Sequence, residues 1–301
     1  MRNVITKTLV EYCVNREFVF LTGDVGYNAL EPLRDAMGSR FINAGVAEQN
    51  MVSVAAGMAK AGLDPWVYSI APFIYARPFE QIRNDVCMHD LPVRFIGNGG
   101  GYAYGVMGGT HHALEDYGTL VGLLNMHAFV PAFAEDAVVI IKKLFDFKHP
   151  AYLRLGVCEK PKDFSLPPYA SWRRLLAGEG PTMLIVGPLA GGIIGELVKL
   201  GEPLRPDVWV LTELPIAPND IPVGFIDSLR RSRHLFVVEE HVAQGGVGQM
   251  IARCLMMIGE APSGFTHRCA LGYVSGLYGS QKFHRKECGL DPDGIMAALK
   301  E

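Results

Sequence analysis

Short apolar runs and helical patterns alternate along the first half of the chain. Residues 4–15 carry apolar side chains on one side of a helical repeat, which predicts an amphipathic helix. Continuous apolar runs predict buried strands at residues 18–22, 66–70, 93–97 and 150–155. Further helices are predicted at residues 48–62, 78–88 and 135–147. Such alternation is typical of α/β domains with mainly parallel sheets.

The alternation starts again after a proline-rich, polar stretch at residues 160–168, which is typical of a linker. Strands are predicted at residues 183–187, 208–211, 234–240 and 265–270. Helices are predicted at residues 189–200, 224–233, 248–258 and 292–300. We therefore predict two successive α/β domains with mainly parallel sheets, at residues 1–159 and 181–301, joined by a linker at residues 160–180.

The composition limits the classes of partner. The chain has 301 residues, 49% of them hydrophobic, which is typical of a globular protein of one or two domains. Its 28 basic and 31 acidic residues give a net charge of -3, which offers no support for a nucleic-acid or anionic-membrane partner. No apolar run approaches ~20 residues and the start lacks a signal-peptide core, so we expect no transmembrane helix. The six cysteines lack paired spacing, which favours reduced thiols in a cytoplasmic protein.

The first predicted strand leads into a candidate site residue. The run at residues 18–22 is followed directly by Gly23 and Asp24. Ligands of open parallel sheets bind at the carboxyl ends of the strands, where Asp24 is expected to lie. Asp24 is therefore a candidate binding residue, and an ordinary turn aspartate is the alternative.

A second candidate is Glu48. Apolar residues run into Asn43, Gly45 predicts a tight turn, and residues 52–61 are small and apolar. This pattern predicts a strand end, a turn and a closely packed helix with Glu48 in its first turn. A helix dipole favours a glutamate at that position, so stabilisation of the helix is one explanation for Glu48.

Two glycine-rich segments have the composition of ligand-binding loops. The loop at residues 97–101 follows a predicted strand, but no helix start or P-loop lysine comes after it, so the nucleotide-binding fingerprint fails. A substrate-channel loop and a simply flexible loop stay open as interpretations. His241 precedes a glycine-rich segment at residues 245–248, at which a predicted helix begins. An anion could bind at this helix start, or the glycines could simply form a tight turn.

Several of these motifs together resemble a known family. Residues 43–51 are followed by Phe73, by Glu-Gln-Ile-Arg-Asn-Asp at residues 80–85, by the loop at residues 97–101 and by Gly-Thr-His at residues 109–111. In order and spacing they resemble the pyrimidine-binding domain of transketolase-like thiamine diphosphate enzymes. The second half resembles the C-terminal domain that follows it in those enzymes, so the resemblance covers nearly the whole chain.

The resemblance implies roles for particular side chains. Glu48 matches the family's catalytic glutamate, which bonds a ring nitrogen of the cofactor's aminopyrimidine and moves a proton there. Phe73 matches an aromatic residue that packs on this ring, with a core phenylalanine as the alternative. His111 matches a catalytic histidine that faces the reacting substrate oxygen, with a role in loop structure as the alternative. Glu48, Phe73 and Asp24 are thus the predicted cofactor-binding residues.

Some positions depart from the family pattern. Gly99 and Met107 stand where transketolases carry a histidine and an aspartate that bind sugar hydroxyls. These changes predict a less polar and roomier pocket, and a deoxy, modified or nucleotide-linked sugar in place of the usual pentose phosphates. Two further aromatic positions around the cofactor ring match Ile70 and Ala76.

The family's signature for the diphosphate and its Mg²⁺, Gly-Asp-Gly…Asn, is not matched. The chain has Gly-Asp-Val at residues 23–25 and nothing that fits the full motif. The resemblance therefore implies half of an enzyme. A separate amino-terminal subunit would bind the diphosphate and Mg²⁺, most simply in a complex with two copies of each chain.

We predict the C-terminal subunit of a split transketolase-like enzyme that transfers a two-carbon ketol unit from a ketose to an aldehyde with thiamine diphosphate. One alternative is the beta chain of a 2-oxoacid or acetoin dehydrogenase complex, because residues 81–84 and His111 fit either enzyme. The other is a non-catalytic assembly subunit, against which the retained Glu48 argues.

Overall fold

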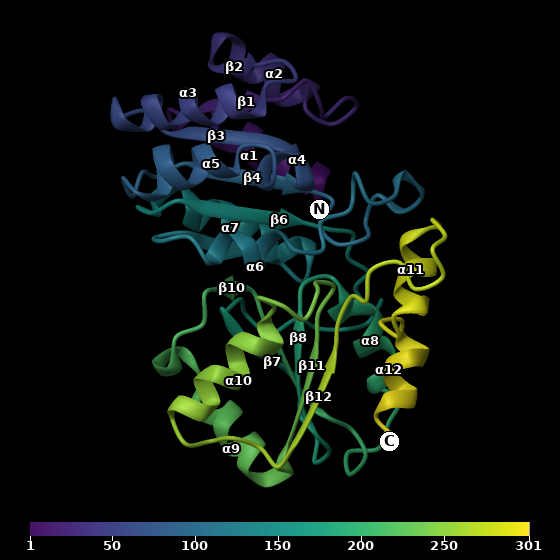
Figure 1. Ribbon diagram of the computed structural model, residues 1–301. Coiled ribbons are helices and arrows are strands. Elements are labelled where there is room, and N and C mark those ends of the chain that lie inside the picture. The colour runs from purple at the N-terminus through teal and green to yellow at the C-terminus, as the bar shows by residue number, and fades with distance from the viewer. Residues whose placement is uncertain (301) are drawn as a thin grey trace.

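The computed structural model describes residues 1–300 and contains two β-sheets, which lie one above the other in Figure 1. The first sheet has seven strands in the order β10-β5-β6-β4-β3-β1-β2. Its strands are β1 (Val19–Thr22), β2 (Phe41–Asn43), β3 (Pro65–Ile70), β4 (Arg94–Asn98), β5 (His127–Phe129), β6 (Ala151–Leu155) and β10 (Glu213–Leu214). Only β10 runs antiparallel to its neighbour in this sheet.

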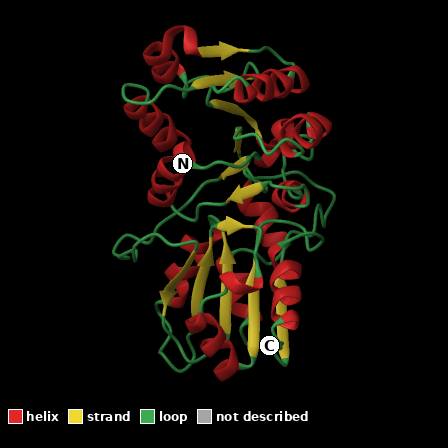
Figure 2. Cartoon of the chain, turned by 90° about the vertical axis from the view of Figure 1, so that its left-hand side faces the viewer, coloured by secondary structure: helices red, strands yellow, loops and turns green. Residues whose placement is uncertain are grey.

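The second sheet has five strands in the order β12-β11-β8-β9-β7, and Figure 2 shows them standing side by side below the first sheet. Its strands are β7 (Trp172–Leu176), β8 (Thr182–Val186), β9 (Asp207–Leu211), β11 (His234–Val238) and β12 (Gly264–Arg268). Only β7 pairs in the antiparallel direction. The prediction of two successive α/β units with mainly parallel sheets is confirmed.

Two strands cross the expected division of the chain. β7 lies within residues 160–180, which were expected to form a linker, and it pairs with β9 of the second sheet. β10 follows β9 in the chain but returns to the first sheet, where it pairs with β5. Edge strands of this kind depend on a distant partner, so a local pattern does not identify them. The division into domains at residues 159 and 181 stays a prediction.

Helices cover both faces of the first sheet. They are α1 (Arg2–Tyr12), α2 (Glu31–Met37), α3 (Glu48–Lys60), α4 (Ala71–Tyr75), α5 (Phe79–Gln81), α6 (Asp116–Val121) and α7 (Ala134–Asp146). Along β1, Phe20 packs into a cluster with α1, α2 and α7, whereas its neighbour Leu21 packs into a cluster with α3, α4 and α6. Alternate side chains of a strand point to opposite faces, so β1 is buried on both.

The second sheet is also covered on both faces. Its helices are α8 (Leu189–Leu197), α9 (Val223–Ser232), α10 (Val247–Met257), α11 (Gln281–Glu287) and α12 (Pro292–Ala298). On β8, Ile185 packs with α8 and α12, and Leu184 packs with α9 and α10. The cluster around Leu184 is continuous with the one around Leu21 in the first sheet, so the two halves share one apolar core.

The predicted helices and strands are present near their expected bounds, with one change of type. The helix expected at residues 78–88 is the short α5 followed by a π-helical turn, Ile82–Cys87. The short helices α2, α4, α6 and α11 were not predicted, because pieces of one or two turns carry too little periodic pattern. None of the helices within residues 1–300 is long and apolar enough to cross a bilayer.

The parallel strands place the candidate residues along one edge of the first sheet. The segments that follow the carboxyl ends of β1, β2, β3 and β4 carry Asp24, Glu48, Phe73 and His111 respectively. β1 lies between β2 and β3, and β4 lies next to β3. This edge is where open α/β sheets bind their ligands.

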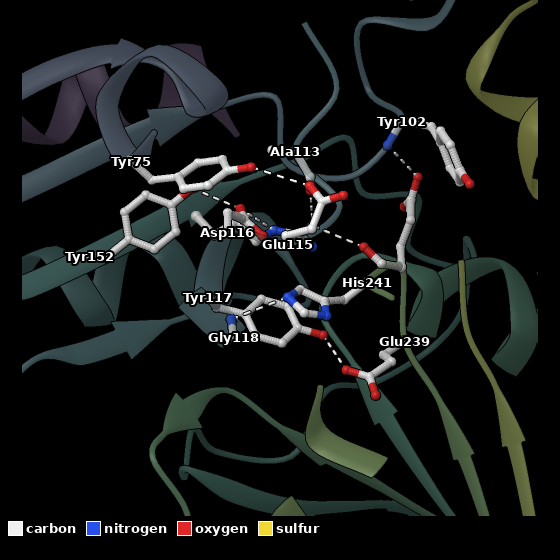
Figure 3. A network of polar contacts seen from close by, with 12 residues as sticks. Tyr75, Tyr102, Ala113, Glu115, Asp116, Tyr117, Gly118, Tyr152, Glu239 and His241 are labelled. Carbon is white, nitrogen blue, oxygen red and sulfur yellow. Dashed lines mark hydrogen bonds and ion pairs between the residues drawn. The ribbon is translucent and has the colours of Figure 1, made fainter. Parts of the chain in front are cut away.

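Arg154 on β6 is the centre of a buried polar network between the two sheets. Figure 3 shows Ala113, Asp116 and Tyr152, which belong to this network. The Arg154 side chain is only 4% exposed, and its Nε donates to Oδ2 of Asp116 at 2.8 Å. Its Nη2 donates to the backbone carbonyl oxygens of Ala113 and Glu240, each at 2.9 Å. Tyr152 donates to the same Asp116 oxygen at 2.8 Å. One buried cation thus ties the segment before α6 to the end of β11.

The glycine-rich loop at residues 97–101 packs against this network. A Cβ on Gly100 would lie 2.4 Å from Nε of Arg154, and a Cβ on Gly101 would lie 2.6 Å from Cδ of Glu240. The buried side chains fill the space that side chains of the loop would need. The close packing at Gly100 and Gly101 favours an ordered loop, in which glycine allows the chain to approach these side chains.

We predict that Arg154→Met strongly destabilises the protein. The variant leaves the carboxylate of Asp116 buried without its cation, and breaking one side of such a pair costs about 3–5 kcal/mol. The free energy of unfolding from urea titrations measures the effect. Arg34→Met is the matched control, because the Arg34–Asp35 pair is exposed and such pairs contribute about 0–1 kcal/mol. Equal losses in the two variants would contradict the assignment.

Candidate active site

Glu48 is the first residue of α3 and lies directly behind a tight turn. Gly45 adopts a left-handed φ of 71°, which a residue with a side chain rarely adopts. The Asn43 side chain accepts a hydrogen bond from the Gly45 backbone nitrogen at 3.0 Å and so braces this turn. The Glu48 carboxyl is buried, with 4% of the side chain exposed, and lies against Gly23 at the end of β1.

Arg77 pairs with this buried carboxyl. Its Nη1 donates to Oε1 of Glu48 at 2.7 Å, and its side chain stays 43% exposed. The Gln49 amide donates to the Arg77 backbone oxygen at 3.4 Å, which joins the two segments a second time. A hollow of about 440 Å³ is lined by Arg77 and residues 46–50.

Phe73 on α4 contacts the same Arg77 side chain. The guanidinium carbon of Arg77 lies 3.7 Å from the centroid of the Phe73 ring, in cation–π contact. Arg77 lies in the turn that follows α4, and its side chain folds back over the Phe73 ring of that helix. The ring of His111 meets Phe73 edge-on, with centroids 5.2 Å apart. Glu48, Arg77, Phe73 and His111 therefore form a continuous row of contacts.

His111 lies in the long loop between β4 and α6. Its Nδ1 is 2.9 Å from the hydroxyl oxygen of Thr110. If Thr110 donates this bond, the proton of the neutral ring sits on Nε2, which is then free to donate to a substrate oxygen. Tyr104 also packs against His111, with ring centroids 5.8 Å apart.

The pocket beside His111 is not the roomier one expected from Gly99. Gly99 has a left-handed φ of 78°, and a Cβ there would lie 2.2 Å from the Tyr104 ring. Tyr104 fills the space, and its hydroxyl accepts a hydrogen bond from Asn98 at 2.8 Å. Met107 is exposed in the 3₁₀ turn Gly105–Met107 of the same loop. The expectation of extra room is therefore wrong for the part of the pocket at Gly99.

Residues of the second half of the chain form hydrogen bonds with the loop that carries His111. His112 is buried, and its Nδ1 lies 2.9 Å from the hydroxyl of Tyr273, while its Nε2 lies 2.8 Å from the Gly105 carbonyl oxygen. The Tyr102 hydroxyl donates to the carbonyl oxygen of Gly272 at 2.6 Å. His112 thus points away from His111 and fixes the loop from behind.

Asp24 lies apart from this row. It has a left-handed φ of 58°, is exposed, and accepts a hydrogen bond from the Asn43 amide at 2.8 Å. This bond, together with one from Tyr27, lowers the pKa of Asp24. Asp24 lines a separate hollow of about 210 Å³ with Thr22, Tyr27 and Asn43. Its role in cofactor binding stays a prediction.

His241 and the following glycines serve the junction between the two halves. His241 is fully buried, stacks on Tyr117 with centroids 4.0 Å apart, and accepts a hydrogen bond from the Gly118 backbone nitrogen at 3.1 Å (Figure 3). The anion at the start of α10 is the chain's own Glu239, whose carboxylate accepts from the Val247 backbone nitrogen at 2.8 Å. An external anion is therefore not needed to explain these glycines.

Arg77 is the site residue that the sequence analysis missed. The sequence shows a cation, Arg77, four residues after Phe73. Arg77 and Glu48 are 29 positions apart in the chain, so a local pattern does not reveal their contact. Ala76, expected to stand at an aromatic position, is exposed beside it. Within residues 1–300, no group of three or more His, Cys, Asp or Glu side chains is arranged to bind a metal ion.

Comparison with known proteins identifies the family. Residues 1–158 match the family described as transketolase, pyrimidine binding domain. The chain belongs to the transketolase family. Membership of this family implies thiamine diphosphate as the cofactor, and it confirms the resemblance stated from the motifs.

Named relatives of this transketolase chain are of similar length. One is a subunit of the apulose-4-phosphate transketolase of Actinobacillus succinogenes, 30% identical over 89% of this chain and 86% of its own. The subunit of the same name from Phocaeicola vulgatus is 28% identical, over 84% of this chain and 83% of its own. These relatives favour the subunit of a split transketolase-like enzyme over the dehydrogenase alternative.

Solved structures agree with this assignment. A split gene transketolase, described as an inactive beta4 tetramer, is 28% identical and has a TM-score of 0.81, with 99% of this chain and 96% of that one covered. Transketolase from Campylobacter jejuni is 16% identical with a TM-score of 0.75, and the match covers 99% of this chain and 46% of that one. The second comparison shows the shared fold. This transketolase chain is therefore one subunit of a split transketolase-like enzyme.

We predict that acid destabilises this transketolase chain in part through His112. Burial lowers the pKa of His112, so the folded state keeps the ring neutral while the unfolded state takes up a proton below about pH 6.5. The unfolded state then binds more protons, and stability falls as the pH drops through that value. Urea titrations between pH 7.5 and 5.5 measure this slope.

His112→Gln should flatten the pH dependence of stability, whatever its effect at pH 7.5. His89→Gln is the control, because His89 is exposed. The His127 ring, whose pKa is also lowered by burial, stays in both variants and contributes equally. A slope unchanged by His112→Gln would show that folding does not lower the pKa of His112.

Proposed function

We propose that this chain supplies one wall of a thiamine diphosphate site and that the assembled enzyme transfers a two-carbon ketol unit from a ketose phosphate to an aldehyde. The observation that carries the proposal is the contact row of Glu48, Arg77, Phe73 and His111 at the carboxyl edge of the first sheet. It occurs in a chain of the transketolase family, and three of its members, Glu48, Phe73 and His111, are the residues that resemble that family's motifs.

The row fits an aminopyrimidine ring. The Arg77 guanidinium is flat, as an aminopyrimidine ring is, but it donates an N–H to Glu48, whereas the ring nitrogen would bond Glu48 by accepting its proton. The guanidinium lies 2.7 Å from Glu48 and 3.7 Å from the centroid of Phe73, so the site accepts a planar group between a carboxyl and an aromatic face. These are the two contacts that the family resemblance assigns to the cofactor ring.

Glu48 and Phe73 would bind and orient the ring. The cofactor, when bound, supplies the reactive carbon that takes up the two-carbon unit. Glu48 would hold a proton between its carboxyl oxygen and a ring nitrogen, shielded from water by its burial. Phe73 would fix the plane of the ring by stacking, for about 0.5–1.5 kcal/mol beyond area burial.

His111 would act on the substrate. With Nδ1 occupied by Thr110, its Nε2 proton can stabilise negative charge on a substrate oxygen. The Phe73 contact keeps the imidazole beside the cofactor ring. Asp24, on the neighbouring loop, is a further candidate for contact with the cofactor.

A partner chain would complete the site. We propose that a separate amino-terminal chain binds the diphosphate and Mg²⁺, and that two copies of each chain form a cytoplasmic complex. The 28% identical split gene transketolase is described as inactive in its beta4 form, which supports the need for a partner. Residues 1–159 would face the cofactor ring, and residues 181–301 would brace the His111 loop.

The substrate proposal follows from the pocket and from the relatives. Met107 and Gly99 replace two groups that bind hydroxyls, and Tyr104 fills the space at Gly99. A site with fewer polar contacts rejects a hydroxyl-poor sugar less strongly. The relatives named as apulose-4-phosphate transketolase chains support a ketose phosphate of that kind as a substrate.

We predict that the chain is inactive alone and active with its partner, and that Glu48→Gln abolishes this activity. Loss of a general acid–base group typically lowers the rate by about 10²–10⁴. The measurements are ketol transfer by the reconstituted pair and exchange of the proton on the cofactor's reactive carbon. Glu11→Gln is the control, because Glu11 is exposed on α1. Full activity of the homogeneous chain alone, or normal proton exchange in Glu48→Gln, would refute the proposal.

We predict that the reconstituted pair prefers apulose 4-phosphate or another modified sugar over xylulose 5-phosphate, with ribose 5-phosphate as acceptor. His111→Ala should lower kcat about 10²–10³-fold on every substrate, because an oxyanion donor is lost. Met107→Asp should instead raise kcat/KM for xylulose 5-phosphate relative to the preferred substrate. A highest kcat/KM on the pentose phosphates would contradict the substrate assignment.

A further inference from the structure

Arg77 makes, within the chain, the two contacts expected of the cofactor ring. Its guanidinium donates to Glu48 at 2.7 Å and lies over Phe73 with 3.7 Å between the guanidinium carbon and the ring centroid. An aminopyrimidine that bonds Glu48 and stacks on Phe73 needs the same volume. The guanidinium and the cofactor ring therefore exclude one another.

The pairing has a physical reason in the cofactor-free chain. Glu48 is 4% exposed, and a buried carboxylate without a cation or hydrogen bonds is strongly unfavourable. Its position at the start of α3 offers the helix dipole, which gives partial compensation. Arg77 adds a full positive charge, so the cofactor-free site is stabilised by the arginine that fills it.

Arg77 is also placed so that its side chain can move away from Glu48 and Phe73. Its side chain is 43% exposed, and it lies just beyond the C-terminal end of α4. A guanidinium that swings out regains full hydration. The exchange thus replaces one planar group by another. Glu48 has a partner in both states, as an acceptor from Arg77 and through a shared proton with the ring nitrogen.

We propose that Arg77 occupies the cofactor-ring position in the cofactor-free chain, and that its displacement sets the affinity for thiamine diphosphate. The inference rests on the proposed function, since it takes Glu48 and Phe73 as the ring site. Cofactor binding then selects the fraction of molecules in which Arg77 has left, and the apparent Kd is the intrinsic Kd divided by that fraction. Arg77 is in this sense an affinity-determining residue of the site.

The test is calorimetric titration of the reconstituted complex with thiamine diphosphate and Mg²⁺. Arg77→Met keeps the length and apolar body of the side chain but removes the charge and the planar donor, so binding should tighten about tenfold. Arg77→Lys, which keeps the charge without the planar stacking group, should give an intermediate Kd. An unchanged or weaker affinity of Arg77→Met would overturn the inference.

The matched control for this titration is Arg16→Met. Arg16 also pairs with a carboxylate, Asp146 at 3.0 Å, and lies over an aromatic ring, Phe145 at 6.0 Å, but it precedes β1 at the opposite edge of the sheet. The complex that carries Arg16→Met should have the same Kd for thiamine diphosphate as the unaltered complex. If neither the unaltered complex nor any variant binds the cofactor, the proposed function fails, and this inference with it.

A second measurement uses the unaltered protein and does not depend on how the variants fold. Phenylglyoxal modifies free guanidinium groups, and mass spectrometry reports the modification of each arginine. Displacement predicts that saturating thiamine diphosphate and Mg²⁺ increase the modification rate of Arg77 several-fold, with Arg16 unchanged. Protection of Arg77 by the cofactor would show that the arginine contacts the ligand, which overturns the inference.

Discussion

The architecture depends on satisfying one buried cation. Arg154 has almost no contact with water, so its N–H donors need acceptors from the chain itself. It finds them in Asp116 and in the carbonyl oxygens of Ala113 and Glu240. Satisfying this one group fixes the start of α6 against β6 and brings the end of β11 to the same point. The contact between the two halves is therefore polar at its centre, although an apolar core continues around it.

The partners of Arg154 also hold the loop between β4 and α6, which carries His111 of the candidate active site. Ala113 and Asp116 close that loop on one side, and Glu240 accepts from the Tyr102 backbone nitrogen at 3.0 Å on the other. Burial raises the pKa of Glu240, but the charge of Arg285 and the hydrogen bonds from Arg285, Gln281 and the Tyr102 backbone nitrogen together outweigh burial and lower it, so the carboxylate stays an acceptor. His111 lies between these anchors. The second half of the chain thus fixes the loop that carries His111.

The site itself is organised by a different charge, the buried carboxyl of Glu48. The turn at Gly45 aims it at the carboxyl edge of the first sheet, and Arg77 compensates it there. A buried carboxyl is stabilised by a cation, and the Arg77 guanidinium supplies it while packing on the ring of Phe73.

The sequence by itself determined the alternation of strands and helices, the α/β class with two sheets and the positions of Glu48, Phe73 and His111 after successive strands. Periodicity and turn residues act within a few positions, so they are readable locally. Only the tertiary structure decided that Arg77 meets Glu48, that Tyr104 fills the space at Gly99, and that Glu239 is the anion at the start of α10. These contacts depend on how loops and strand ends are brought together by the order of strands in the sheets. A buried charge selects its partner only when the whole chain has folded around it.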